Sequence, residues 1–192
     1  MSQPLHVAFD LDGTLVDTAP DLVRALNAAI APRGIDRVPL EAVRLMVGRG
    51  ARALIREAYG RAGRPFDEAE LEEALALFLQ VYREGIADLS RPFPGVEAAL
   101  DRLAASGARL SVCTNKPTFL ASALLDALGL TRRFERVVGP DDVAAKKPDP
   151  GHLMAAFGGA RPGRSVLVGD SETDALAARA AGVPFILYVH GY

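Results

Sequence analysis

Four aspartates and one threonine stand at or just beyond the ends of short apolar runs that are typical of buried strands. Asp10 and Asp12 follow the first run, Thr114 follows the second, and Asp170 and Asp174 follow the fourth. Ligands of open α/β sheets bind at the carboxyl ends of the strands, so we expect these side chains to gather at one sheet edge. Carboxylates held close together repel one another, which favours a cation among them. Oxygen ligands, without a cysteine or histidine set of metal spacing, predict Mg²⁺ rather than zinc.

Five runs rich in β-branched and apolar residues would form the strands that position this acidic group. They are residues 5–9, 109–113, 135–138, 165–168 and 184–189. Most are continuous apolar runs, which suits strands buried on both faces of a parallel sheet. Helical patterns separate the last four runs, one of them opening at Asp149-Pro150. The alternation of strand and helix predicts an α/β fold with a doubly wound, five-stranded parallel sheet.

Residues 18–88 carry helix signals but no convincing strand, and this stretch is too long for a single crossover between strands. One helix should open at Thr18 and end at Gly34, and another should open at Asp67, where the sequence resembles a capping box. An α-helical insertion should therefore follow the first strand. The expected domains are an α/β core of residues 1–17 and 89–192 and a helical domain of residues 18–88.

Composition and charge exclude several classes of partner. The 192 residues are 49% hydrophobic and 24% charged, with a net charge of -2, which gives no electrostatic reason to expect nucleic acid or a membrane surface. The single cysteine, Cys113, cannot form an internal disulfide and is expected to pack in the core. We see no signal peptide and no apolar stretch of membrane-spanning length, so we expect a cytoplasmic protein.

Four segments, in order along the chain, resemble the motifs of the haloacid-dehalogenase-like (HAD) hydrolases. They are Asp10-Leu11-Asp12-Gly13-Thr14, Thr114, Lys147-Pro148, and Gly169-Asp170-Ser171 followed by Asp174. The stretch from Phe9 to Leu22, together with Val47-Gly48-Arg49-Gly50-Ala51, looks most like the phosphoglycolate phosphatase family. The resemblance implies that the helical insertion after the first strand is a cap domain, which excludes water and contacts the leaving group of the substrate.

The resemblance also implies a phosphoryl transfer in which Asp10 is the nucleophile and forms an aspartyl-phosphate. Asp12 would protonate the leaving alkoxide and then activate the water that hydrolyses the intermediate. Thr114 and Lys147 would hold the transferring phosphoryl oxygens. We prefer Lys147 over Lys146 because a proline follows it, as in the family pattern. Asp12 also favours phosphate esters over halides, since a halide leaves without a proton.

Further roles in the site follow from the same resemblance. The implied Mg²⁺ ligands are Asp10, Asp170 and the backbone carbonyl of Asp12, with Asp174 either a ligand or just behind them. Gly13, Thr14 and Asn115 are expected at the substrate phosphate, where Gly13 permits a tight turn and a close approach of backbone amides. Arg49, between two glycines of the insertion, is expected to contact the non-phosphate end of the substrate, the alternative being an ordinary exposed cation.

We therefore expect a Mg²⁺-dependent phosphomonoester hydrolase, monomeric or homodimeric, acting on 2-phosphoglycolate or a similar small phosphorylated metabolite. A pyrophosphatase and a sugar phosphomutase share these motifs and remain open as alternatives. A non-enzymatic receiver-like module that accepts a phosphoryl group is a more distant alternative. A receiver needs its acceptor aspartate after the third strand, where Gly139 and Pro140 stand in this sequence.

Overall fold

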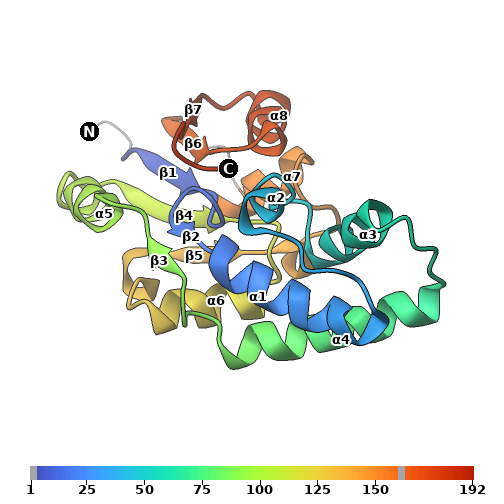
Figure 1. Ribbon diagram of the computed structural model, residues 1–192. Helices are drawn as coiled ribbons and strands as arrows, with labels where there is room; N and C mark the ends of the chain where they lie inside the picture. Colours follow the sequence, from blue (N-terminus) through green and yellow to red (C-terminus); the bar gives the residue numbers. More distant parts are fainter. Residues whose placement is uncertain (1–3, 160–162) are drawn as a thin grey trace. The chain divides into compact units, whose positions relative to one another are not determined.

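The computed structural model describes residues 4–159 and 163–192, and the chain divides into two compact units (Figure 1). The first, here called the α/β unit, comprises Met1–Asp17 and Arg91–Tyr192, and the second, the helical unit, comprises Thr18–Ser90. The second boundary lies two residues beyond the one expected from the sequence. Within the described residues, every helix is too short or too polar to cross a membrane.

The α/β unit is built on a five-stranded sheet whose strands all run parallel (Figure 1). The strands are β1 (His6–Phe9), β4 (Arg109–Cys113), β5 (Arg136–Val138), β6 (Ser165–Gly169) and β7 (Phe185–Leu187). Their order is β5-β4-β1-β6-β7, which places the fully buried β1 in the centre. The parallel α/β sheet expected from the continuous apolar runs is confirmed. Because Phe9 pairs with both Val112 and Val168, the residues that follow these strands meet at one edge.

Four helices of the described residues pack on this sheet, and the start predicted at Asp149-Pro150 agrees with the structure. They are α5 (Val96–Ala105), α6 (Thr118–Ala127), α7 (Pro150–Ala156) and α8 (Glu172–Ala181). Asp149 caps α7 by accepting a hydrogen bond from the Gly151 N–H at 2.8 Å. Helices α7 and α8 bury Leu153 and Ala178 in one core with strand residues that include Cys113. Burial raises the pKa of the Cys113 thiol to about 12, so this residue serves packing rather than nucleophilic chemistry.

A two-stranded antiparallel ribbon, which the sequence analysis did not predict, joins the ends of the segments that flank the helical unit. It consists of β2 (Val16–Asp17) and β3 (Arg91–Pro92). Each strand has two residues and one of them contains a proline, so neither produces a periodic pattern. The described residues also form three short 3₁₀ turns: η1 (Ala31–Arg33), η2 (Thr131–Arg133) and η3 (Pro140–Asp142).

The helical unit contains α1 (Ala19–Ile30), α2 (Leu40–Arg44), α3 (Ala51–Arg61) and α4 (Glu68–Glu84). Its core is formed where α1 packs on α4, with Leu26 and Phe78 fully or almost fully buried. The helix end expected at Gly34 is found only in part, because α1 ends at Ile30 and the 3₁₀ turn η1 continues to Arg33, before Gly34 in the left-handed conformation. The start expected at Asp67 is found, and its side chain accepts from the Glu70 N–H at 2.8 Å. Helices α2 and α3 were not predicted individually from the sequence.

A buried aspartate at the start of α1 ties together the two ends of the helical unit. Asp21 is fully buried, and its Oδ2 accepts hydrogen bonds from the Ser90 N–H and hydroxyl, both at 2.7 Å, and from the Leu89 N–H at 3.0 Å. The Arg24 guanidinium donates to the other carboxylate oxygen at 3.3 Å and to the Gly85 carbonyl at 2.7 Å. The Asp21 carboxylate therefore satisfies several hydrogen-bond donors that would otherwise be unpaired where the two ends of the unit meet.

We expect Asp21→Ala to lower the free energy of unfolding of the helical unit by about 3 kcal/mol, because it leaves buried donors unsatisfied. Urea unfolding followed by circular dichroism measures this loss. Asp36→Ala, at an exposed position of the same unit, is the control and should change stability by less than about 0.5 kcal/mol. Equal stability of the two variants would contradict the structural role assigned to Asp21.

Candidate active site

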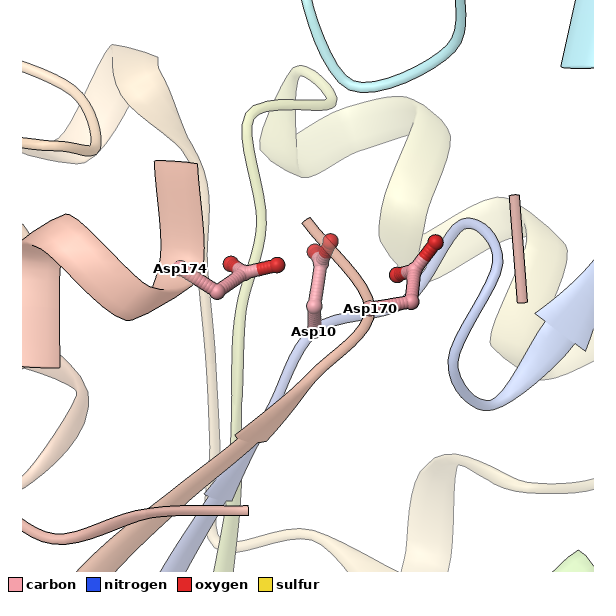
Figure 2. Close-up of side chains that lie close together, drawn as sticks. All are labelled: Asp10, Asp170 and Asp174. Carbon is pink, nitrogen blue, oxygen red and sulfur yellow. The ribbon is translucent and has the colours of Figure 1, made fainter. Parts of the chain in front are cut away.

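Three carboxylates come together where β1 and β6 end and α8 begins. Asp10 directly follows β1, Asp170 directly follows β6, and Asp174 lies in the first turn of α8. One oxygen from each residue lies within 4.8 Å of the others. Figure 2 shows the three side chains, with Asp10 between Asp170 and Asp174. The sheet register thus assembles a compact acidic group from residues that are up to 164 positions apart.

Lys147 is the cation that lies inside this acidic group. Its Nζ is 2.9 Å from Asp10 Oδ1 and 2.6 Å from Asp174 Oδ1, and its side chain is 2% exposed. The Lys147 N–H donates to His152 Nδ1 at 3.0 Å, which fixes the backbone from which the side chain extends. Lys146, its neighbour in sequence, is exposed. The lysine that precedes the proline is therefore the one placed against the carboxylates.

The carboxylates of Asp10, Asp170 and Asp174 carry more negative charge than the single ammonium group of Lys147 neutralises. Burial, and next the charge of Asp174, raise the pKa of the Asp10 carboxyl to about 8, although Lys147 opposes the shift. Burial by itself would lower the pKa of Lys147, but the attraction of Asp10 and Asp174 outweighs it and raises that pKa above its ordinary value. Lys147 stays charged, and Asp10 still holds a proton near neutral pH when no further cation is present.

Asp170 is held by a hydrogen bond to each carboxylate oxygen. Thr14 Oγ1 donates to Oδ1 at 2.7 Å, and the Tyr192 N–H donates to Oδ2 at 3.0 Å. Burial raises the pKa of Asp170, while these two donors work in the opposite direction. Thr14, which the sequence analysis assigned to the substrate phosphate, thus contacts a carboxylate of the site. Tyr192 was not predicted to have any part in the site.

Asp174 has neighbours at both of its oxygens. Oδ1 pairs with Lys147, and Oδ2 accepts from the Ser171 hydroxyl at 2.6 Å and from the Ser171 N–H at 3.2 Å. Ser171 in turn accepts from the Asp174 N–H, which completes a capping box at the start of α8. These contacts suit a residue that orients Lys147 from just behind the other carboxylates.

Asp12 forms an ion pair that the sequence analysis missed. Lys116 Nζ donates to Asp12 Oδ1 at 2.8 Å, and both side chains are at most 10% exposed. Lys116 lies two residues beyond Thr114 and donates its backbone N–H to the Thr114 hydroxyl at 3.1 Å. Its position just after the carboxyl end of β4 was a usable signal, because residues there face the site.

Of the remaining predicted residues, Thr114, Asn115 and Gly13 belong to the α/β unit, and Arg49 belongs to the helical unit. Thr114 and Asn115 are buried just after β4, and the Asn115 side-chain amide donates to the Lys147 carbonyl at 3.2 Å. Gly13 has a φ of +90°, and a Cβ at this position would overlap the Asp170 carboxylate, so only glycine fits. Arg49 lies in the helical unit, exposed in the turn before α3.

The oxygen ligands of the site fit a hard divalent cation. When all groups are ionised, the four carboxylates of the site face the ammonium groups of Lys116 and Lys147, which leaves two negative charges unbalanced. The pKa of about 8 at Asp10 is the consequence of that imbalance in a buried place. All the candidate ligands are oxygen atoms, which hard cations prefer over softer metals. Asp10 and Asp170 are the residues best placed to hold such an ion.

The chain resembles known proteins over almost its whole length. A model of the haloacid dehalogenase-like hydrolase family matches residues 7–188. A protein named phosphoglycolate phosphatase from Caulobacter vibrioides is 52% identical over 188 residues, which cover 97% of this chain and 79% of that protein. Another of the same name, from Mesorhizobium japonicum, is 43% identical over 100% of this chain and 85% of its own length.

The fold agrees equally well with solved structures. The crystal structure of a protein described as a predicted phosphoglycolate phosphatase, from Haemophilus somnus, superposes with a TM-score of 0.91. The two chains are 32% identical, and the match covers 100% of this chain and 88% of that one. The family match spans the whole acidic site as well as both structural units. The chain therefore belongs to the haloacid dehalogenase-like hydrolases.

Proposed function

We propose that this protein is a Mg²⁺-dependent phosphomonoester hydrolase that works through an aspartyl-phosphate on Asp10, with 2-phosphoglycolate as its substrate. The observation that carries the proposal is the placement of Asp10, buried at the end of the central strand between Lys147 and Asp170. Asp12 supplies a second carboxylate two residues further on, paired with Lys116. The names of the relatives supply the substrate.

The chemistry requires two displacements at phosphorus. A carboxylate oxygen of Asp10 attacks the phosphorus atom, and the bond to the ester oxygen breaks. Asp12 gives that oxygen a proton, so the product leaves as an alcohol. A water molecule then attacks the phosphorus of the aspartyl-phosphate while Asp12 takes up its proton, which regenerates the Asp10 carboxylate and releases inorganic phosphate.

Positioning and charge neutralisation are the main requirements of such a transfer. Lys147 and the Thr114 hydroxyl would hold the transferring phosphoryl oxygens. Asp10, the Asp12 carbonyl and Asp170 would hold Mg²⁺, and Asp174 would orient Lys147. When bound, Mg²⁺ supplies positive charge that neutralises phosphoryl oxygens and lets Asp10 ionise. The helical unit would serve as the cap, with Arg49 at the non-phosphate end of the substrate.

A panel of phosphate compounds tests the proposed function. Purified protein with Mg²⁺ should release inorganic phosphate from 2-phosphoglycolate faster than from pyrophosphate or sugar phosphates, and EDTA should abolish the release. A pyrophosphatase would prefer pyrophosphate, and a phosphomutase would yield an isomerised sugar phosphate instead of inorganic phosphate. A receiver-like module would stay phosphorylated without turnover. Absence of phosphate release from 2-phosphoglycolate would sink the proposal.

Mg²⁺ binding should depend on pH because of Asp10. The pKa of this group rises from about 4 in the unfolded chain to about 8 in the metal-free fold. The contribution of Asp10 to stability is therefore full below about pH 4 and is lost as the pH rises toward 8. Since Mg²⁺ requires the ionised carboxylate, binding at pH 6.5 should release about one proton, and affinity should rise from pH 6 to pH 8.5.

Titration calorimetry in buffers of different ionisation enthalpy measures that proton release. Urea unfolding in EDTA gives the companion measurement. The stability of the wild type should fall relative to Asp10→Asn between pH 6 and pH 8.5, because the amide does not titrate. A Mg²⁺ affinity that is constant over this pH range would contradict the assignment of Asp10 as a ligand.

A further inference from the structure

Lys116 is a buried ammonium group beside the acid–base residue of the proposed reaction rather than beside the nucleophile. We propose that Lys116 binds a carboxylate on the leaving group, so that the enzyme selects phosphomonoesters of 2-hydroxy carboxylic acids. This inference rests on the proposed function, because it uses Asp12 as the residue that protonates the leaving group.

The two buried lysines of the site serve different carboxylates. Lys147 pairs with Asp10 and Asp174 at 2.9 and 2.6 Å, which places it at the nucleophile. Lys116 pairs with Asp12 at 2.8 Å. In the proposed reaction the phosphoryl group is transferred to Asp10, and the departing oxygen is protonated by Asp12. The charge of Lys116 is therefore placed on the side where the leaving group departs.

The leaving group must come close to this ammonium group. A general acid lies roughly 2.6–3.2 Å from the oxygen that it protonates, so the ester oxygen contacts the Asp12 carboxylate. Lys116 Nζ contacts that same carboxylate at 2.8 Å. In 2-phosphoglycolate the carboxyl carbon is only two bonds from the ester oxygen. An ammonium group has three N–H donors, which is enough to join the carboxylates of Asp12 and of the substrate.

The neighbours of Lys116 fix its backbone and bury its side chain. Its backbone N–H donates to the Thr114 hydroxyl at 3.1 Å, and a Cβ at Gly139 would come within 2.7 Å of the Lys116 carbonyl oxygen. The side chain is 5% exposed, so its charge is little screened by water. A charged hydrogen bond in such a place is stronger than one at the surface. A leaving group without a carboxylate could not form this charged hydrogen bond with Lys116.

Binding of two matched phosphonates, which cannot be hydrolysed, tests the inference without relying on turnover. In 3-phosphonopropionate a methylene group replaces the ester oxygen of 2-phosphoglycolate, and propylphosphonate has the same chain without the carboxylate. Calorimetry with Mg²⁺ should show that the wild type binds 3-phosphonopropionate roughly 10–100-fold more tightly. Lys116→Met should reduce this ratio to about 1–3, whereas Lys146→Met, at an exposed lysine, should retain it.

The outcomes separate the inference from the proposed function. A ratio near one in the wild type, or a ratio that survives in Lys116→Met, overturns the inference even if 2-phosphoglycolate is hydrolysed. A ratio that depends on Lys116 supports it, and failure to release phosphate from 2-phosphoglycolate would then overturn only the proposed function. If Lys116→Met does not fold, Lys116→Gln, which keeps a polar chain without the charge, is measured in the same way.

Discussion

Asp10→Asn is expected to lower kcat for 2-phosphoglycolate by about 10⁴-fold or more, because an amide cannot form the aspartyl-phosphate. Acid-quenched reactions with labelled substrate should trap a phosphorylated protein in the wild type and none in the variant. The fold should survive the change. Burial already raises the pKa of Asp10 to about 8, so a neutral amide of the same shape suits the metal-free site near neutral pH.

The control for this prediction is Asp36→Asn, an equivalent change at an exposed position of the helical unit, which should leave kcat unchanged. Circular dichroism of both variants would show that lost activity does not reflect unfolding. Turnover by Asp10→Asn above about a hundredth of the wild-type rate would remove Asp10 from the role of nucleophile.

Asp12→Asn is expected to lower kcat for 2-phosphoglycolate by about 10²–10⁴-fold, the usual contribution of a general acid or base. The first chemical step on p-nitrophenyl phosphate should survive, since nitrophenolate leaves without a proton. In the proposed mechanism the second step needs Asp12 to activate water, so the aspartyl-phosphate should accumulate. Stopped-flow measurement should therefore show a burst of about one nitrophenolate per enzyme, followed by slow turnover.

This burst separates a role in proton transfer from a structural one. If Asp12→Asn merely disturbed the ion pair with Lys116, the aspartyl-phosphate would not accumulate, and no burst would appear with p-nitrophenyl phosphate. Lys116→Met provides the comparison, because it breaks the same pair but keeps the carboxylate of Asp12. The absence of a burst in Asp12→Asn would contradict the proposed acid–base role.

The fold was predictable from the sequence where local pattern and burial agree. Continuous apolar runs identified the five strands, and Asp149, Asp67 and Gly34 marked helix ends through local hydrogen bonds or backbone conformation. The ribbon of β2 and β3 was not predictable, because two-residue strands have no period. Helix α3 was not identified individually, although its buried residues include Ile55 and Tyr59.

The acidic residues were predictable for a similar reason. Asp10, Asp12 and Asp170 stand directly after strand signals, and parallel strands bring their carboxyl ends to one edge. What the sequence by itself determined is therefore which carboxylates gather, and from their oxygen atoms it predicts a hard cation. These properties depend on residue type and on short-range order along the chain.

The tertiary structure alone decided the pairing of charges within that group. It placed Lys147 between Asp10 and Asp174, and it paired Lys116 with Asp12, 104 positions away in the chain. Such partners depend on strand order, on register and on the direction of each side chain, none of which is written in the local pattern of residues. For the same reason the raised pKa of Asp10, which reflects burial among neighbours from several strands and loops, could only be learned from the folded protein.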